Sequence, residues 1–409
     1  MVWYDHWEDG YDENVVLAKA STTEVWGDGD ASNGCAPSVT SCTNSNDRLM
    51  AGDTIVIQNT VELPRIKSNI RYDGSDRIQA SAPIAVTRGA YPDQPGSLMA
   101  GAVEVLDVDA WGMTFEAPIG MDVGQHMQAF QLTLIYIMAM EDKTRVTLQN
   151  GYVLTLSQGE GKALRVNIGH RISSNKPIQA TLVTGDVWSY YELRVRYLGA
   201  VYITTQLLLL QWFSLLPVEQ FSTEFVSPVG DSFGKTKSLI YNPGPDIASV
   251  AVSYLDETTG QPRNIGTRIG PKQATLSPVN PTGSGMWVNS SVPILCLSLT
   301  DTEVSVADGQ VTGGQFYDWG FPMVPRPDLT SQVLIGWGYG CTNNNCYGQE
   351  DRNVVWVSPI QDADIYLDLD NRGTNYQITQ LDAMESHKFR DEGDHDMSVS
   401  EVCITKLHF

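Results

Sequence analysis

The heptapeptide Ile78-Gln-Ala-Ser-Ala-Pro-Ile84 has two similar counterparts further along the chain, Ile172-Ser-Ser-Asn-Lys-Pro-Ile178 and Val288-Asn-Ser-Ser-Val-Pro-Ile294. Each copy has an aliphatic residue, four mostly small or polar residues, Pro and Ile, and then continues into an alternating sequence. The copies are 94 (177 − 83) and 116 (293 − 177) residues apart, counted between their prolines, Pro83, Pro177 and Pro293. A unit of that length predicts one module stacked in tandem.

The sequence around these copies favours strands. Apolar and polar residues alternate at 53–58, 143–148, 353–358 and 364–368, and turn clusters such as 157–161 separate such runs. No long stretch has helical periodicity. We therefore predict an all-β fold of tandem β-sandwich domains built from an internal repeat. The predicted parts are three modules, 1–122, 123–232 and 233–330, and a C-terminal β segment, 331–409, that packs on the modules or pairs between them.

Composition limits the partners that the chain can have. It has 409 residues, of which 42% are hydrophobic and 18% are charged, as in ordinary folded proteins. The formal net charge is −22 and the pI is about 4.5. Because phosphate backbones repel so acidic a chain, we expect no nucleic-acid binding, and cations or basic protein surfaces are better partners.

One uncharged stretch, residues 197–218, is long enough to span a bilayer and has four consecutive leucines at its centre. It also contains Thr204, Thr205, Gln206, Gln211 and Pro217, and it lacks a strong basic flank. We therefore expect a buried strand or helix here rather than a membrane span.

Six cysteines leave the redox state open. Cys35 and Cys42 lie in one polar loop and Cys341 and Cys346 in another, so both pairs are disulfide candidates, with free thiols as the alternative. Cys296 is expected in a buried strand. The spacings are not those of a zinc site.

Calcium is the only cofactor that the sequence suggests. Acidic side chains in Gly-containing loops suit this cation, which binds six to eight oxygens. The candidate ligands are Asp9, Asp12, Asp28 and Asp30 near the N-terminus, and Asp368 and Asp370 in a segment similar to the start of a calcium loop. The alternative is a solvated acidic loop.

No catalytic site is predicted. Gly230-Asp-Ser232-Phe-Gly234 matches the nucleophile-elbow string, but that serine must lie on a strand-to-helix turn of a parallel sheet, and no βαβ alternation surrounds it. A P-loop fails because one residue is missing between Gly230 and Gly234-Lys-Thr236. We expect a protein that is not an enzyme.

Several stretches together carry a family resemblance: YDHWEDGYD (residues 4–12), TTEVWGDGD (22–30), YDGSDRI (72–78), LMAGAVEV (98–105) and DWGF (318–321). They resemble a β-rich family related to the N-terminal region of IgGFc-binding protein. Among its algal members, the pyrenoid shell proteins of diatoms are similar in size and in having tandem β domains. Residues 198–211 look like an insertion against the family pattern.

The resemblance implies a non-enzymatic protein that self-assembles into a sheet-like or tubular lattice around the Rubisco-containing pyrenoid, in the plastid stroma. Its partners would be copies of itself, and Rubisco or other pyrenoid proteins. The sequence offers two candidate contact segments, because exposed strand edges must be covered: Trp3, Tyr4 and Trp7, and Val402 and Ile404. The alternative is a secreted or cell-surface adhesion module with disulfides and calcium-stabilised loops.

Overall fold

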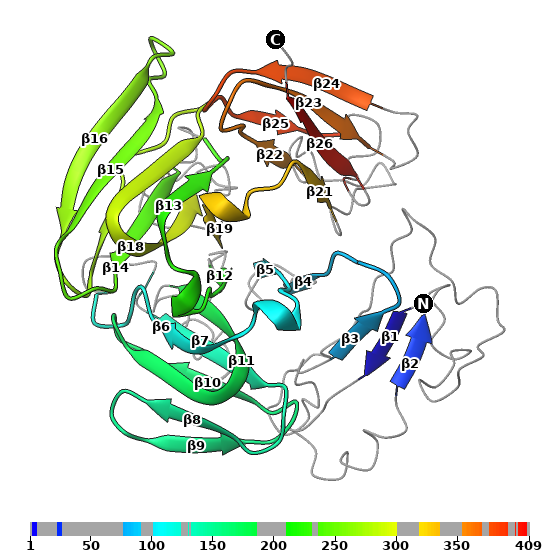
Figure 1. Cartoon of the computed structure of the whole chain (residues 1–409), viewed down its shortest axis with the longest axis vertical. Helices are drawn as coiled ribbons and strands as arrows, with labels where there is room; N and C mark the ends of the chain where they lie inside the picture. Colours follow the sequence, from blue (N-terminus) through cyan, green and yellow to red (C-terminus); the bar gives the residue numbers. More distant parts are fainter. Residues whose placement is uncertain are drawn as a thin grey trace, which may run out of the picture.

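The computed structural model confirms the all-β class (Figure 1). In its described part, every element is a strand or a three-residue 3-10 turn. That part consists of residues 2–5, 23–26, 77–90, 101–123, 130, 132–185, 210–230, 236–300, 319–335, 354–369, 376–391, 397 and 400–406.

The first unit is a group of seven antiparallel strands in which a long strand, β11, occupies the centre. β11 pairs with four strands, β6, β7, β8 and β12, while β10 pairs with β7 and β9 with β8. The strands are β6 (Gly112–Glu116), β7 (Leu132–Ala139), β8 (Thr144–Leu148), β9 (Val153–Leu156), β10 (Gly161–Arg165), β11 (Arg171–Gly185) and β12 (Leu210–Ser214).

The second unit has the same pairing around β18. That strand pairs with β13, β14, β15 and β19, while β17 pairs with β14 and β16 with β15. The strands are β13 (Ser222–Ser227), β14 (Lys237–Asn242), β15 (Ala248–Leu255), β16 (Pro262–Ile269), β17 (Gln273–Leu276), β18 (Met286–Thr300) and β19 (Trp319–Pro322).

The second and third motif copies lie where these long strands pass from one ladder to another. In β11, residues 172–174 pair with β8, whereas residues 178–185 pair with β7. In β18, residues 288–290 pair with β15 and residues 295–299 with β14. Pro177 and Pro293 fall between the two ladders and are exposed. A proline has no N–H to donate, so it suits the short segment that leaves one ladder before joining the next.

The two units also share their registers. Ile172 pairs with Leu148 of β8, and its counterpart Val288 pairs with Val252 of β15. An internal repeat would produce such agreement, and the repeat itself stays a prediction. The ladders β6–β11 and β13–β18 both cross predicted domain boundaries, at 122 and 232, because β6 and β13 lie before them.

The first motif copy lies in the N-terminal part of the chain. Ile78 is in β3 (Arg77–Ala80), which pairs with β1 (Val2–Asp5), and β1 also pairs with β2 (Thr23–Trp26). Pro83 follows in the exposed link to β4 (Thr87–Ala90), which pairs with β5 (Gly101–Glu104). Three 3-10 turns come at corresponding places: η4 (Val108–Ala110), η6 (Val218–Gln220) and η8 (Arg326–Asp328).

The C-terminal strands form a sheet in the order β21-β26-β23-β24 and a separate pair, β22–β25. They enclose a core of their own around Ile365, Leu367 and Phe389. The strands are β20 (Val324–Pro325), which pairs with β13, then β21 (Gln332–Leu334), β22 (Val355–Val357), β23 (Ala363–Asp368), β24 (Tyr376–Leu381), β25 (His387–Phe389) and β26 (Glu401–Lys406).

The two units share one continuous core. Phe115, Ile172 and Leu182 of the first unit pack in the same cluster as Leu239 and Leu297 of the second. Backbones approach closely at Gly120, where a Cβ would lie 2.2 Å from the backbone of Asn167, and at Gly230, where it would lie 2.0 Å from the carbonyl oxygen of Ser284. Only glycine fits at these two positions.

Candidate assembly surface

The edge strand β16 is the most exposed regular element of the second unit. It ends the strand order β16-β15-β18-β13-β20, and no described strand pairs with its outer edge. It forms the outer left border of that unit in Figure 1. All its residues except Thr267 and Ile269 are exposed, and Ile265 is 38% exposed although it faces the side of the core. An open edge of eight residues is long for a strand that is left without a partner.

The backbone groups that β16 presents follow from its register. In antiparallel pairs, residues alternate between bonding their partner and pointing away from it. The Asp256 N–H donates to the carbonyl of Gln261 at the hairpin end, so the next residue, Pro262, belongs to the class that points away, as its missing N–H allows. By alternation, Asn264, Gly266 and Arg268 direct their backbone N–H and C=O groups toward the open edge.

A rigid turn holds the β15–β16 hairpin. The Asp256 carboxylate accepts hydrogen bonds from the Thr258 N–H (3.2 Å), the Thr259 N–H (3.0 Å) and the Thr259 hydroxyl (2.9 Å), and it pairs with the Arg263 guanidinium at 2.6 Å. These interactions, the Thr259 hydroxyl first among them, lower the pKa of Asp256. Gly260 supplies the left-handed residue that completes the turn, at φ +64°.

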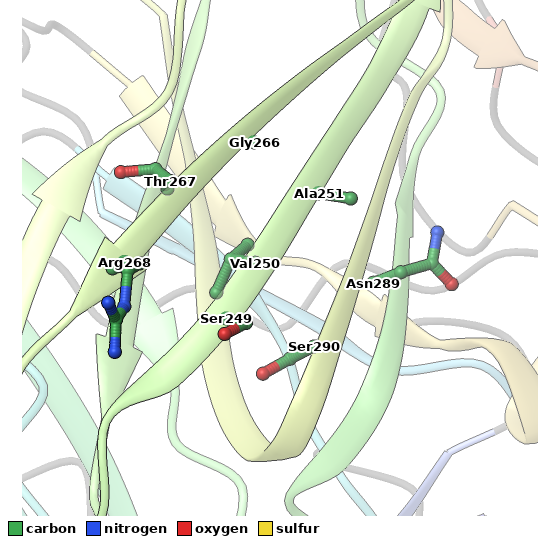
Figure 2. Close-up of a pocket in the computed structure, with 8 residues that line it drawn as sticks. All are labelled: Ser249, Val250, Ala251, Gly266, Thr267, Arg268, Asn289 and Ser290. Carbon is green, nitrogen blue, oxygen red and sulfur yellow. The ribbon is translucent and has the colours of Figure 1, made fainter.

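A depression of about 440 Å³ lies across β16, β15 and β18, next to the open edge (Figure 2). Its lining contains small residues, Ser249, Ala251 and Gly266, and a Cβ added at Gly266 would meet nothing within 4 Å. Arg268 and Asn289 lie at its margin. By register, the position of Gly266 corresponds to Val153 in β9. The depression therefore results from small residues on this face of the second unit.

An ion pair between a buried carboxylate and a half-exposed lysine joins the two units. Glu116 of β6 is 2% exposed, accepts a hydrogen bond from the Tyr241 hydroxyl of β14, and lies 2.7 Å from Nζ of Lys272. Burial, and then the Glu116 carboxylate, raise the pKa of Tyr241. The three side chains come from both units, and none of them lines the depression beside β16. Their geometry is that of a structural joint.

Most predicted ligand and disulfide residues lie outside the described residues: Asp9, Asp12, Asp28, Asp30, Asp370, Cys35, Cys42, Cys341 and Cys346. Asp368 is described and lies buried in β23. In the described part of the chain, no three His, Cys, Asp or Glu side chains gather as metal ligands would. Both described cysteines, Cys296 and Cys403, are free thiols.

The predicted contact segments have strands on both sides. β1, which carries Trp3 and Tyr4, lies between β2 and β3, and β26, which carries Val402 and Ile404, lies between β21 and β23. Both edges of β1 are occupied along its whole length, and both edges of β26 are occupied at residues 401–403, whereas Ile404 is paired with β23 only. Val402 is buried in the C-terminal core, so its side chain contacts that core rather than a second copy. Trp7 lies outside the described residues. The sequence did not indicate β16 as a contact strand, because the position of a strand at the edge of a sheet depends on which other strands pair with it.

Cys403 is held as a thiol. Burial, and then its hydrogen bond to the Glu401 carboxylate at 3.3 Å, raise the pKa of Cys403 to about 11. The thiolate is the reactive form, so Cys403 is a poor nucleophile at neutral pH.

The uncharged stretch at 197–218 includes β12, where Trp212 and Phe213 are buried, and its residues before Leu210 are not described. Within the described residues, no helix has the length and apolar character needed to cross a membrane.

Comparisons with known proteins do not assign the chain to a family. No family model matches the chain, and no curated protein matches it significantly. Among solved structures, the chain is similar to one in "X-ray structure of the entire lipid-containing bacteriophage PM2", at 8% identity over 80% of this chain and 88% of that one, with a TM-score of 0.11. A likeness this weak carries no argument about the fold or the function of this chain.

Proposed function

We propose that this protein is a non-enzymatic structural protein that assembles with copies of itself, and that β16 is a contact strand. The observation that carries the proposal is the eight-residue open edge of β16, with the outward backbone groups of Asn264, Gly266 and Arg268. An exposed edge of this kind is a ready template for a strand from another chain. Pairing with another copy would satisfy these groups and cover Ile265.

Two further features support assembly over catalysis. The depression beside β16 is lined mainly by small and hydroxyl side chains, with no histidine, carboxylate or thiol that would serve acid–base or nucleophilic chemistry. The shared registers of the two units are those expected of copies of one module, and we include that repeat in the proposal.

The setting of the assembly rests on the sequence motifs alone. The resemblance to pyrenoid shell proteins suggests a sheath around Rubisco in the plastid stroma, with itself as the main partner. An extracellular adhesion module is the second setting, and its predicted disulfide residues and most of its predicted calcium ligands lie outside the described residues.

The test is negative-stain electron microscopy of the purified chain, with and without added calcium. We expect extended sheets, tubes or filaments from the wild type. Gly266→Pro removes one outward N–H from β16 without removing a bond to β15, so it should abolish these assemblies while circular dichroism stays unchanged.

The matched control is Val153→Pro, which places proline at the corresponding position of β9 in the first unit. It should leave assembly intact. A wild type that stays monomeric under all these conditions, or assembly that persists in Gly266→Pro, would overturn the proposal. Assembly that appears only with calcium would point to the acidic loops as the next site to map.

A further inference from the structure

A second long open edge lies at the other end of the described chain. β24 ends the order β21-β26-β23-β24, with no described strand beyond it, and forms the outer border of the C-terminal strands in Figure 1. It has six residues, and Ile378 on it is 63% exposed. Among the terminal strands of the described sheets, β16 and β24 are the two longest.

The two edges differ in charge. On the face of β16 that carries the depression, Arg268 is the charged residue of the strand. Arg263, on the other face, is paired with Asp256. The face of the C-terminal sheet that carries Ile378 has no Lys or Arg at its described strand positions, and it has two carboxylates that are not buried, Asp364 and Glu401. Asp368 lies on the same face but is buried, so it does not contribute to this contact. Two copies of β16 would bring Arg268 side chains together, whereas β24 would bring carboxylates toward Arg268.

The shapes are also complementary. Gly266 leaves open space on the outer face of β16, next to Ala251 of β15. Ile378 is a large apolar side chain that stands exposed on β24. A large side chain on an adjacent strand can cover a strand glycine and thereby shield it from water. A strand added at β16 with Ile378 near Gly266 would bury both.

We propose that the occupant of the β16 edge is β24 of a second copy, paired head to tail. This inference rests on the proposed function. It adds the strand that pairs with β16 and the head-to-tail polarity of the contact between copies. A contact between two different surfaces of the same chain does not close on itself unless the rotation allows a ring, so it generates extended filaments or rows.

The experiment uses two blocked variants of the full chain. Gly266→Pro blocks β16 and leaves β24 free, while Ile378→Lys with Gln380→Lys puts two positive charges on β24 and leaves β16 free. Juxtaposed like charges should raise the concentration needed for assembly at least about a hundredfold. Each variant alone should therefore stay monomeric where the wild type assembles.

Mixing the two variants decides the polarity. The free β24 of one and the free β16 of the other should form a 1:1 complex that grows no further, as measured by analytical ultracentrifugation. The matched control, Ile378→Glu with Gln380→Glu, should still assemble at low salt, and about 1 M NaCl should weaken that assembly, since salt screens the attraction to Arg268.

Three results would overturn the inference. They are assembly of the Lys variant of β24 at the wild-type concentration, a mixture that gives no 1:1 complex, and a Glu control that fails as completely as the Lys variant. Each of these results can occur while the wild type assembles and the Gly266→Pro variant does not. In that case the proposed function would still hold, and only the assignment of β24 as the partner strand would be wrong. A monomeric wild type would instead remove the proposed function itself.

Discussion

The first and second units have the same strand pairing but differ at their outer hairpins. The β8–β9 ladder of the first unit has four residue pairs, and the β15–β16 ladder of the second has eight. The central strands β11 and β18 both have fifteen residues and both carry the motif where they pass from one ladder to another. The common part is the part that encloses the core, and the variable part is the exposed edge. Such differences at the surface are where function is expected in a fold.

The joint between the units shows a second difference. Lys272 has a left-handed backbone, with φ +55°, and the corresponding residue of the first unit is Gly159, with φ +75°. The correspondence follows from the hydrogen bonds of their N–H groups to Asn242 and Ala139, which occupy equivalent positions in β14 and β7. A lysine accepts this unfavourable conformation where its side chain is needed to neutralise Glu116.

The largest expected effect compares the three copies of the motif. Ile178 and Ile294 are fully buried, so Ile178→Ala and Ile294→Ala should each lower the free energy of unfolding by about 3 kcal/mol. Ile84 is 45% exposed, and Ile84→Ala should cost less than about 1 kcal/mol. Urea unfolding, with a constant slope against denaturant, measures all three. An equal loss in all three variants would contradict the difference in packing between the copies.

The next effect tests the joint. Lys272→Ala leaves the buried Glu116 carboxylate without its cation, which should cost about 2 kcal/mol, less than for a fully buried pair because Lys272 is 48% exposed. Lys272→Gly loses the same ion pair but relieves the left-handed strain, so it should be less destabilising than Lys272→Ala by about 1 kcal/mol. Thermal and urea unfolding of both variants measure this difference. If the glycine variant is the less stable of the two, Lys272 is not strained.

The class of fold was predictable because it depends on local pattern. The alternation at 143–148 and 364–368 predicted β8 and β23, since side chains in a strand alternate between the core and the opposite face. The change of ladder within the motif at 172–178 could not be predicted, because it depends on which strands lie on either side.

The candidate assembly surface could not be predicted from the sequence for the same reason. Val402 and Ile404 alternate as an exposed strand would, yet β26 lies inside its sheet. Pro262-Arg-Asn-Ile265 has no distinctive pattern, yet β16 lies at an edge. Whether a strand has one neighbour or two is decided by residues far away in the chain. The same holds for the contacts of Glu116. Tyr241 is 125 residues away from it in the chain and Lys272 is 156 residues away, so no local motif could indicate that the three side chains meet.

A smaller effect concerns the 3-10 turn that precedes each unit. The Asp107 carboxylate accepts hydrogen bonds from the N–H groups of Asp109 (2.9 Å) and Ala110 (3.0 Å), whereas Pro217 at the corresponding place before the second unit makes no such bond. Asp107→Ala should therefore lower the free energy of unfolding by about 1 kcal/mol. Asp107→Asn keeps an acceptor and should lose about half as much or less. Urea unfolding compares the two, and equal losses would show that the cap contributes nothing through its hydrogen bonds.

The smallest effect exchanges one residue between the corresponding edges β9 and β16. Gly266→Val introduces the residue of the first unit into the second, and open space around Gly266 accommodates it. Because glycine in a strand is less favourable than a β-branched residue, this variant should gain about 0.5 kcal/mol of stability, and Val153→Gly should lose a similar amount. The two shifts in urea midpoint should be opposite in sign. If Gly266→Val gains stability but assembles less well than the wild type, then the glycine is kept for contact with another copy at a cost to the stability of the monomer.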